Sequence, residues 1–582
     1  MTNAQIADIF DEIADLLEFQ AANPFRVRAY RNGARAVRDL HEPLETLVRT
    51  GAQDLTKIAG IGKDLAAKCM ALIETGKIEM LDELRAEVPE SVLALLRIPG
   101  LGPKKAAALH KQLGINSLDE LRQACQQQQV RVLKGFAAKT EELILKGIDF
   151  ATATTQEVRL YWADADEIAE QLLTFLKSCP AVERMEVAGS YRRGKETVGD
   201  LDLLVVARQA DEVMDRLAEF PRRKEQLLRG GTKMSVRLDN GLQVDLRVVP
   251  AESFGAALQY FTGSKEHNVV VRSRAKQLGL KINEWGVFRI EDGRETYVAG
   301  ATEQEVYATL DLPLFPPELR EARQEFAWAK AGKLPTLIAA DDIRGDLHMH
   351  THATDGKASI REMADAARQR GLQYIAITDH SKRVSMANGL NAERLLAQWE
   401  EVDRIDREMG KKFHILKGIE CDILEKGGLD LPDDVLQQAD WVVASVHYGQ
   451  KQPVEQITAR IVEALRNPHV SAIAHPTGRL INRREPYAVD LDRVMEVAAE
   501  EKKMLELNAN PARLDLNDLH CAMAKQRGIP IVISTDAHSV DGLDVMRYGI
   551  LQARRAGLEK ADVANSRPFA QFVKLLRGRK AD

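Results

Sequence analysis

Histidine is concentrated in the C-terminal part of the chain, where it recurs at one kind of position. Ten of the 13 histidines follow residue 343. Seven apolar segments in this region are predicted to be strands, and six of them finish on His, Glu or Asp-x-His. If these strands form a β/α barrel, their carboxyl ends meet at one face and the side chains converge there. Imidazole and carboxylate together favour a multinuclear Mn²⁺, Zn²⁺ or Fe²⁺ centre.

A lone histidine is more often a satisfied core or surface residue than a metal ligand. We keep this alternative for the histidines that lie off the predicted strand ends, His414, His469 and His520, and leave it open for His352.

A second arrangement lies near the middle of the chain, in residues 187–202. A predicted strand there ends in Gly-Ser, a basic turn follows, and a second strand opens with Asp-x-Asp. Because side chains alternate along a strand, Asp200 and Asp202 point to one side, where two carboxylates suit Mg²⁺. Asp245 on an adjacent strand would complete a two-metal site. The preceding Gly-Ser argues against a mere hairpin edge, and we expect Gly189, Ser190 and Arg193 to hold triphosphate oxygens.

Two Gly-x-Gly turns, each followed by an Ala-rich helix, form an internal repeat in the N-terminal part. Glycines at a helix start let backbone N–H groups approach a phosphate. One copy alone would favour a simple tight turn. Two copies with basic neighbours indicate contact with successive DNA phosphates, through Gly60, Gly62, Lys63, Gly100, Gly102 and Lys104. A basic run between Arg26 and Arg38 is interpreted as another phosphate-facing surface, with a solvated helix face as the alternative.

The elements that must position these residues form several domains, since 582 residues exceed one ordinary core. Residues 1–150 follow helical periodicity. Strands begin near residue 183, and Asp239-Asn240-Gly241 predicts a hairpin turn. A stretch rich in Pro and charge, 312–335, is predicted to be a linker. From residue 344 onward strands alternate with helices, which is typical of a parallel sheet or barrel.

Composition narrows the class of protein. A hydrophobic content of 45% and a charged content of 29% exclude a disordered chain. The net charge of −6 argues against holding nucleic acid by bulk positive charge, but permits local basic patches. Five scattered cysteines indicate a reducing compartment and no disulfide framework. With no signal peptide and no apolar run long enough for a membrane span, we expect a soluble cytoplasmic, nucleoid-associated protein.

A second distinctive motif is Tyr260-Phe261-Thr262-Gly263-Ser264-Lys265-Glu266-His267-Asn268 through Arg272. Together with the Asp-x-Asp segment, it makes residues 1–318 closely resemble the family X DNA polymerases, the group containing DNA polymerase beta. The resemblance implies that Asp200, Asp202 and Asp245 are catalytic Mg²⁺ (or Mn²⁺) ligands. It also implies nucleotide contacts by Gly189, Ser190, Arg193, Tyr260, Phe261, Gly263, Asn268 and Arg272. Two departures, Lys265 near the incoming base and Val198 near the triphosphate, are expected to alter nucleotide affinity.

In lyase-competent relatives, the position of Lys68 forms a Schiff base. Phe25 and Arg26 occupy the positions of a supporting His and Lys. The sequence therefore leaves two alternatives for Lys68, lyase chemistry and simple phosphate binding.

Residues 343–582 resemble the PHP (polymerase and histidinol phosphatase) domain. The resemblance implies up to three divalent metals, Mn²⁺, Zn²⁺ or Fe²⁺, with Glu420 as a bridging carboxylate. All nine positions hold competent ligands, so we expect an active phosphoesterase. The implied ligands are His348, His350, Asp355, His380, Glu420, His447, His475, Asp536 and His538.

The resulting fold class is a multidomain α+β and α/β protein with a helical helix-hairpin-helix N-terminal region, a polymerase beta-like nucleotidyltransferase palm and thumb, and a seven-stranded β/α (distorted TIM-like) PHP barrel. The expected divisions are a helical DNA-binding (8 kDa-like) domain, a second helix-hairpin-helix (fingers-like) subdomain, the palm, a nucleotide-selecting thumb-like subdomain, a linker and the PHP domain, at 1–85, 86–150, 151–250, 251–318, 319–342 and 343–582.

The leading hypothesis is a monomeric, bifunctional DNA repair enzyme. It would fill short gaps in gapped or nicked DNA from dNTPs, as in base excision repair, and process 3′ ends as a 3′→5′ exonuclease or phosphoesterase. One alternative is a DNA-end-processing phosphoesterase whose polymerase half only docks DNA. Another is a non-enzymatic scaffold that recruits ligase or other repair proteins. A small-molecule phosphatase would not explain the helix-hairpin-helix repeats.

Overall fold

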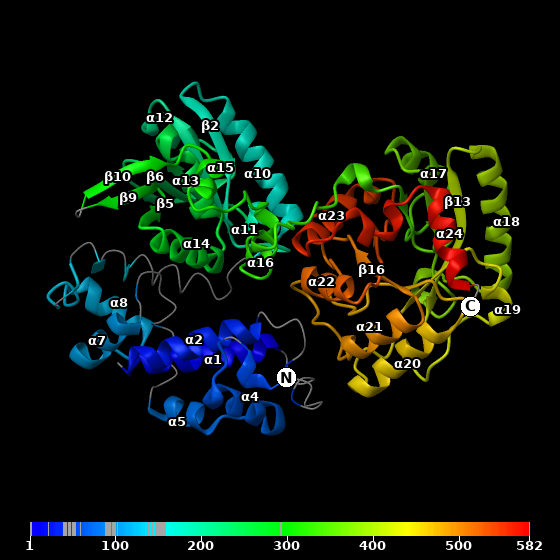
Figure 1. Ribbon diagram of the computed structural model, residues 1–582, viewed down its shortest axis with the longest axis horizontal. Coiled ribbons are helices and arrows are strands. Elements are labelled where there is room, and N and C mark those ends of the chain that lie inside the picture. Colours follow the sequence, from blue (N-terminus) through cyan, green and yellow to red (C-terminus); the bar gives the residue numbers. More distant parts are fainter. Residues whose placement is uncertain are drawn as a thin grey trace. The chain divides into compact units, whose positions relative to one another are not determined.

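The computed structural model divides the chain into two compact units, Met1–Val158 and Arg159–Asp582 (Figure 1). The structure describes residues 3–580 except 21, 39–43, 45–47, 49–53, 59, 88–94, 96–100, 102, 134, 138–139, 142–143, 146–158 and 292–293. In the described part, no helix is long and apolar enough to cross a membrane.

The first unit is helical, as its periodicity predicts. In α1 (Asn3–Phe19), Ile6, Phe10 and Ile13 recur on one face and are fully buried. This apolar stripe packs with the other helices of the unit into a single core. The remaining described helices are α2 (Pro24–Arg38), η1 (Leu55–Lys57), α4 (Lys63–Thr75), α5 (Glu79–Glu87), α7 (Pro103–Leu113) and α8 (Leu118–Gln126).

The second unit begins with a five-stranded sheet whose order is β2-β4-β7-β6-β5. Strand β4 lies parallel to β7 and antiparallel to β2. Alternation along β4 sends Leu201, Leu203 and Val205 into a core shared with α10 (Trp162–Lys177) and α12 (Ala210–Ala218). The predicted turn joins β6 to β7. The strands are β2 (Val182–Val187), β4 (Asp200–Ala207), β5 (Arg223–Arg229), β6 (Lys233–Leu238) and β7 (Gln243–Val248).

The opposite face of this sheet is covered by α13 (Phe254–Thr262), which packs Phe254, Ala257 and Leu258 against Leu204. A small antiparallel sheet follows, with the order β10-β9-β8. The elements of this part after α13 are α14 (Lys265–Gln277), β8 (Leu280–Asn283), β9 (Gly286–Glu291), β10 (Arg294–Ala299) and α15 (Glu303–Ala308).

Residues 319–342, predicted to be a linker, contain α16 (Glu325–Lys330) and η4 (Ala340–Asp342) and bury charged side chains. The Arg320 guanidinium is fully buried and its Nη1 donates to Glu303 Oε1 at 2.5 Å. Glu325 is 1% exposed and its Oε1 lies 3.0 Å from His267 Nδ1. These charged side chains therefore have ion-pair or hydrogen-bond partners in the preceding domain and are not part of an exposed linker.

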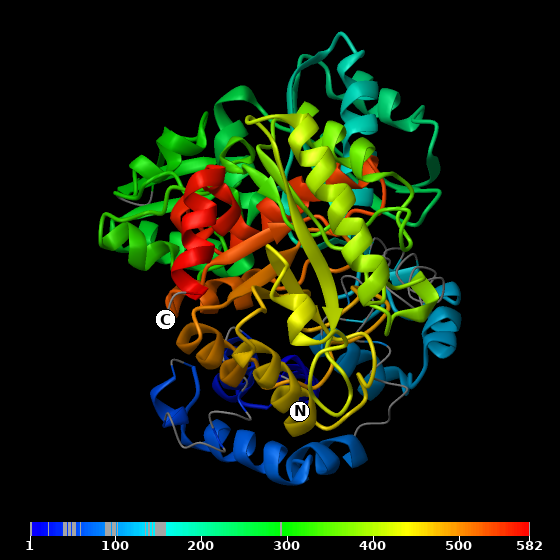
Figure 2. The same cartoon turned by 90° about the vertical axis from the view of Figure 1, so that its right-hand side faces the viewer.

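The C-terminal part is a nearly closed parallel barrel with strands in sequence order (Figure 2). A bridge between Met349 and Ala537 joins the chain after the first strand to the chain after the last. Helix α24 (Phe569–Lys580) packs Phe572 against Tyr374 and Trp441 in the barrel interior. The strands are β11 (Gly345–Asp346), β12 (Tyr374–Ile377), β13 (His414–Asp422), β14 (Trp441–Ser445), β15 (Ala472–Ile473), β16 (Met504–Asn508) and β17 (Ile531–Ser534).

Helices connect the strands, as the sequence pattern predicts, so the carboxyl ends of all seven strands face the same way. The connecting helices are α17 (Ile360–Gln369), α18 (Ala392–Met409), α19 (Asp433–Leu436), α20 (Val454–Arg466), α21 (Leu491–Glu500) and α22 (Asp518–Gln526), and α23 (Met546–Arg555) follows the last strand.

Candidate active sites

The three candidate polymerase carboxylates lie on two neighbouring strands. Asp202 of β4 lies opposite Asp245 of β7 in this parallel pair of strands. Asp200 lies two residues before Asp202 in β4. All three lie on the sheet face opposite α10 and α12, because their neighbours in β4 and β7 enter that core. Asp245 also contacts Lys233 Nζ (3.4 Å) and Gln243 Nε2 (3.1 Å).

The electrostatics of this group indicate a place for a cation. Burial, together with the charges of Asp200 and Asp245, raises the pKa of Asp202 to about 7. Arg247 and Lys233 act in the opposite direction without cancelling the shift. A carboxylate whose pKa is raised by neighbouring carboxylates is stabilised as an anion by a divalent ion that they share, so the donor set fits Mg²⁺ or Mn²⁺.

A tight turn follows β2 and approaches these carboxylates. Gly189, the first residue of α11 (Gly189–Arg192), has φ +66°, and a Cβ there would lie 2.8 Å from Asp202 Oδ2. Only glycine permits this approach of backbone to carboxylate. Ser190 is next in α11, and its carbonyl accepts from the Lys195 N–H. The predicted triphosphate turn and the predicted metal carboxylates are thus adjacent.

Arg193 ends this turn and connects it to the end of α13. Its Nη1 donates to the carbonyl of Thr262, and its Nε donates to Glu321 Oε1 at 3.1 Å. Gly263 is close enough that a Cβ there would lie 3.2 Å from Arg193 Nη1. The Arg193 side chain is only 13% exposed.

The other predicted nucleotide contacts surround the same helix end. Tyr260 and Phe261 belong to the last turn of α13, and Asn268 of α14 donates from Nδ2 to the Tyr260 carbonyl at 2.7 Å. Gln259 Nε2 donates to Asn268 Oδ1, also at 2.7 Å. Arg272, one turn further along α14, donates from Nε to the Asn268 carbonyl. The structure therefore gathers these residues around Asn268.

The two departures from the polymerase beta pattern differ in position. Val198 is fully buried and pairs with Leu160 in a two-stranded element, where it joins the palm core. Lys265 is exposed at the start of α14. Lys265 is therefore open to solvent, whereas Val198 is enclosed in the palm core.

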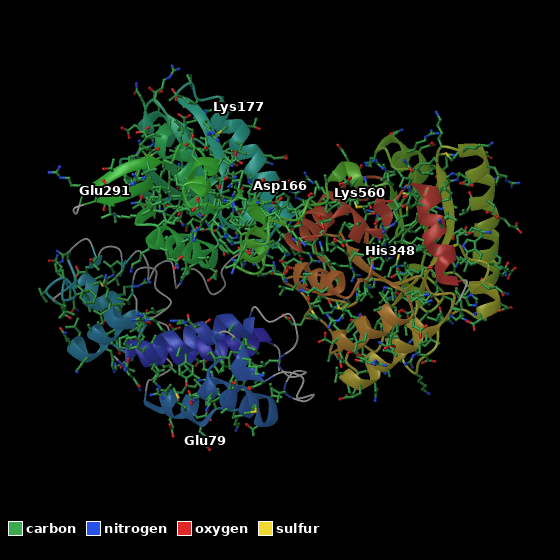
Figure 3. The ribbon with its side chains drawn as sticks, viewed as in Figure 1. Glu79, Asp166, Lys177, Glu291, His348 and Lys560 are labelled. Atoms are coloured by element: carbon green, nitrogen blue, oxygen red, sulfur yellow. The ribbon has the colours of Figure 1, made fainter. Side chains whose placement is uncertain are left out.

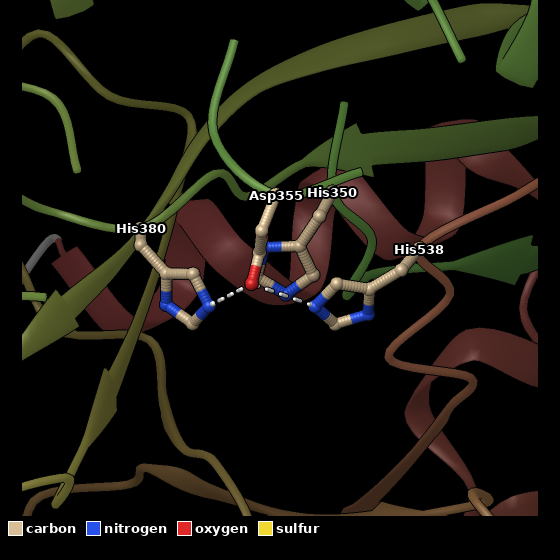
Figure 4. Close-up of side chains that lie close together, drawn as sticks. All are labelled: His350, Asp355, His380 and His538. Carbon is tan, nitrogen blue, oxygen red and sulfur yellow. Dashed lines mark ion pairs between the residues drawn. The ribbon is translucent and has the colours of Figure 1, made fainter. Parts of the chain in front are cut away.

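The barrel brings the nine predicted ligands of the C-terminal region together at the strand ends. Figure 4 shows one group, in which Asp355 lies between three imidazoles. Asp355 Oδ2 is 3.5 Å from His380 Nε2 and 3.4 Å from His538 Nε2, and Oδ1 is 3.8 Å from His350 Nδ1. Two further groups with metal-ligand geometry are His348–His350–Asp536 and His380–Glu420–His447.

Glu420 occupies the middle of these groups. Its carboxylate lies 2.7 Å from His380 Nδ1 and 3.0 Å from His475 Nε2. His348 and His447 each approach it to 3.5 Å. Burial would raise the pKa of this carboxyl, but His380, His447 and His348 lower it well below its usual range. A fully ionised carboxylate among several imidazoles is suited to bridge metal ions.

Several buried polar atoms of this centre lack a hydrogen-bond partner among the described residues. They include His348 Nε2, His350 Nδ1 and His475 Nδ1. Leaving such atoms unpaired is costly. Metal ions would satisfy them, and the mixed nitrogen and oxygen donors fit Mn²⁺, Zn²⁺ or Fe²⁺.

A second layer of carboxylates, which the sequence reasoning missed, orients the imidazoles. Glu506 Oε1 lies 2.7 Å from His348 Nδ1, and Asp422 Oδ1 lies 2.9 Å from His447 Nδ1. Both carboxylates are buried in strands. A metal-binding histidine commonly donates its second N–H to such a group. The sequence offers only a positional signal: Asp422 follows Glu420 by two residues, and Glu506 lies within the predicted strand 504–508, which ends on Asn508 and not on a ligand.

The histidines off the strand ends lie elsewhere. The ring of His414 stacks on Phe569 at a centroid distance of 3.8 Å. His469 and His520 have backbone N–H groups that donate to Asn467 and Asn517. His352 is exposed. These four are absent from the metal-ligand groups of the described residues.

In the N-terminal unit, the first Gly-x-Gly turn precedes α4. Gly60 has φ +97°, and exposed Gly62 caps the helix that begins at exposed Lys63. In the basic run of α2, Arg31 pairs with Asp11 and Asp15 of α1. Gly100 and Gly102 lie outside the described residues, as does the side chain of Lys104.

Lys68 projects from α4 and is held by two partners. Its Nζ donates to Asp64 Oδ1 at 2.5 Å and lies 5.8 Å from the centre of the Tyr30 ring. Burial alone would lower the pKa of Lys68, but its hydrogen bonds to Asp64 and Tyr30 leave it raised. A protonated ammonium suits phosphate better than Schiff-base formation.

Comparison with known families assigns successive parts of the chain. A helix-hairpin-helix domain family matches residues 1–78, and a SAM-like helix-hairpin-helix tandem family matches 92–149. The DNA polymerase beta palm matches 161–245, the DNA polymerase beta thumb matches 257–321, and the PHP domain matches 346–510.

Full-length similarity decides the family. The chain is 42% identical over 580 residues to the DNA polymerase/3'-5' exonuclease PolX of Bacillus subtilis (strain 168), covering 99% of this chain and 100% of that protein. The chain belongs to the family X DNA polymerases with a C-terminal PHP domain. The suspected family and fold class are thereby confirmed.

Each half of this family X polymerase also has separate relatives. DNA polymerase lambda of Rattus norvegicus is 25% identical over 350 residues, which cover 55% of this chain and 56% of that protein. A probable phosphatase of Thermoanaerobacter sp. (strain X514) is 30% identical over 235 residues, covering 38% of this chain and 89% of that protein. Polymerase-like and phosphatase-like sequences are thus joined in one chain.

Proposed function

We propose that this protein is a DNA-directed DNA polymerase that fills short gaps and also removes or cleans 3′ ends as a PHP-domain 3′→5′ exonuclease or phosphoesterase. One observation carries the proposal. A carboxylate triad on β4 and β7 and a cluster of nine candidate metal ligands in the barrel, eight in groups that could hold a metal ion and His475 beside Glu420, occur in the same chain. A docking module would need neither set.

At the polymerase site, Asp200, Asp202 and Asp245 would hold Mg²⁺ or Mn²⁺. A metal bound there would lower the pKa of an attacking 3′-hydroxyl and stabilise the pyrophosphate leaving group. The turn at Gly189 and Ser190 binds the triphosphate together with Arg193. The ribose and base would contact Tyr260, Phe261, Gly263, Asn268 and Arg272.

In the barrel, the nine ligands would hold up to three Mn²⁺, Zn²⁺ or Fe²⁺ ions. Ions held there would supply an activated water for hydrolysis of a phosphate ester, and the chain would need no covalent nucleophile of its own. Glu420 keeps the imidazoles in place through its contacts with four of them. Glu506 and Asp422 fix the ring orientations of His348 and His447.

The N-terminal unit would dock gapped or nicked DNA through phosphate contacts at Gly60, Gly62 and Lys63, and through the second turn at Gly100, Gly102 and Lys104. We assign the helical DNA-binding domains to 1–85 and 86–150, the palm to 151–250, the thumb-like subdomain to 251–318, a connecting segment to 319–342 and the PHP domain to 343–582. The protein would act as a monomer beside other repair proteins such as ligase.

The test is incubation with gapped, 3′-labelled DNA in Mg²⁺ or Mn²⁺, with and without dNTPs. We expect template-directed extension up to the gap end when dNTPs are present, and shortening from the 3′ end when they are absent. Shortening without extension under any condition would favour the alternative, in which the polymerase half only docks DNA. If neither extension nor shortening is observed, the proposal is contradicted.

A further inference from the structure

One helix of the PHP barrel contacts the palm turn predicted to bind the triphosphate. Gln552 of α23 donates from Nε2 to the Gly194 carbonyl at 2.9 Å, and Arg555 donates from Nη1 to the Arg193 carbonyl at 2.6 Å. Gly194 has φ +65°, and a Cβ there would lie 2.6 Å from side-chain carbons of Leu551. Gln552 and Arg555 are at most 5% exposed. Three residues of α23 therefore contact this turn.

The same contact includes a shared carboxylate. Glu321 Oε1 accepts from Arg555 Nη1 at 3.0 Å and from Arg193 Nε at 3.1 Å. Asp518 Oδ2 accepts from Arg555 Nη2 at 2.8 Å. Four cations face two carboxylates in this cluster, namely Arg193, Lys195, Arg323 and Arg555 with Glu321 and Asp518.

Other ion pairs join the polymerase half to the barrel; of these, the pair of Asp166 also reaches the turn, because Tyr191 donates to Asp166 at 2.7 Å, whereas the contacts of Arg554 do not. Asp166, labelled in Figure 3, pairs with Arg547 at 3.2 Å. Arg554 donates from Nε to Glu318 at 2.8 Å and from Nη1 to the Ile338 carbonyl at 3.0 Å. Arg554 and Arg555 are neighbours on α23. A substitution of Arg554 therefore tests the loss of contacts between the domains in general, whereas a substitution of Arg555 also tests the loss of contact with the turn.

We propose that Arg555 and Gln552 are positioning residues for the incoming nucleotide, through which the PHP domain sets dNTP binding at the polymerase site. This inference rests on the proposed function, in which the turn at Arg193 receives the triphosphate. Arg555 acts in two ways. Its hydrogen bond to the Arg193 carbonyl holds the backbone of the turn. It also donates to Glu321, and because this carboxylate is then shared, it neutralises the Arg193 guanidinium less completely. The surplus positive charge of the cluster also favours an anionic ligand.

The test compares four full-length variants: Arg555→Met, Arg555→Lys, Gln552→Met and, as the matched control, Arg554→Met. The dNTP KM and kcat are measured on a one-nucleotide gap, and exonuclease rates on the same preparations. We expect Arg555→Met and Gln552→Met to raise the KM about 5- to 20-fold, as loss of a buried hydrogen bond does, with a much smaller change in kcat. Arg555→Lys should recover part of this loss. Arg554→Met and all exonuclease rates should stay within about twofold.

A second substitution tests the shared carboxylate. In the Arg555→Met background, Glu321→Gln removes the charge that would otherwise hold Arg193, so the dNTP KM should fall back toward the original value. A purely structural role for Arg555 predicts a further rise instead. A KM within twofold in both Arg555→Met and Gln552→Met, or an equal rise in Arg554→Met, would overturn the inference.

Two measurements keep the outcome decisive. The melting curve of each variant shows whether it folds. If Arg555→Met does not fold, Gln552→Met alone tests the inference, because methionine fills a volume similar to that of glutamine. Binding of dTTP to the protein–gapped DNA complex in Ca²⁺ is measured for every variant by equilibrium titration. If the unmodified protein incorporates no nucleotide, the proposed polymerase function fails, whereas the order of dTTP affinities still tests the role of Arg555 and Gln552.

Discussion

Asp202 and Asp245 are register partners on the parallel strands β4 and β7, and Asp202 has a pKa raised to about 7 by burial and by its two carboxylate neighbours. The two side chains arrive from segments separated by a hairpin. Their pairing places negative charge beside the backbone of Gly189, where a cation and a triphosphate can meet.

The raised pKa predicts a pH-dependent Mg²⁺ requirement for nucleotide incorporation. Below about pH 7 Asp202 holds a proton that the metal must displace, so the half-saturating Mg²⁺ concentration should rise by up to about tenfold per pH unit. Above pH 7 it should level off, since the carboxylate is already ionised. Mg²⁺ titrations of the incorporation rate between pH 6 and 8.5 measure this. A constant half-saturating concentration over that range would contradict it.

Lys68 should not form a Schiff base with an abasic site. Its ammonium is held by Asp64 and its pKa is raised, so little free amine is available as a nucleophile. Borohydride trapping on incised abasic DNA should give no Lys68-dependent crosslink. Lys68→Ala should weaken DNA binding by about 1 kcal/mol or less, because it removes one phosphate contact. A crosslink that disappears in Lys68→Ala would show lyase activity.

Glu506→Gln should impair the barrel centre and spare the polymerase. The substitution weakens the partner of His348 Nδ1, which should reduce metal affinity or exonuclease rate about 10- to 100-fold. Elemental analysis and exonuclease assays measure the loss, and gap filling on the same preparations should be unchanged. Exposed Glu501→Gln is the matched control and should behave like the original protein. Equal exonuclease rates in the two variants would remove Glu506 from the account.

Arg320→Met should destabilise the polymerase half. Arg320 is fully buried and donates to Glu303 and to the Phe315 carbonyl, so its loss leaves buried acceptors with fewer donors. Removing one member of a buried ion pair costs about 3–5 kcal/mol. Denaturant unfolding measures the change. Arg289→Met is the control, because its pair with Glu291 is exposed, and should change the free energy of unfolding by less than about 1 kcal/mol.

The sequence predicted the features that depend on local periodicity. Alternation along β4 placed Asp200 and Asp202 on one side, and six of the seven predicted barrel strands ended on ligand-type side chains, whereas the full set of nine candidate ligands was implied by the resemblance to the PHP domain. The nearly closed barrel and the helical N-terminal unit agree with the expected fold.

The features that the sequence did not predict depend on partners distant in the chain. Residues 319–342 read as a linker because of Pro and charge, but Arg320 and Glu325 find Glu303 and His267. Glu506 belongs to no recognisable sequence motif, and its role is visible only in the fold, where the ring of His348 lies beside it. The contact of Arg555 with the Arg193 turn joins residues of two domains, which no local pattern indicates.

The central claim is that one chain holds two independent metal-dependent sites. It is tested most directly by measuring gap filling and 3′-end degradation side by side for the full-length variants Asp200→Ala and His350→Ala. Asp200→Ala should lose incorporation at least about 1,000-fold and keep end degradation, whereas His350→Ala should do the reverse, because each substitution removes one metal ligand. Loss of both activities in either well-folded variant would contradict the claim.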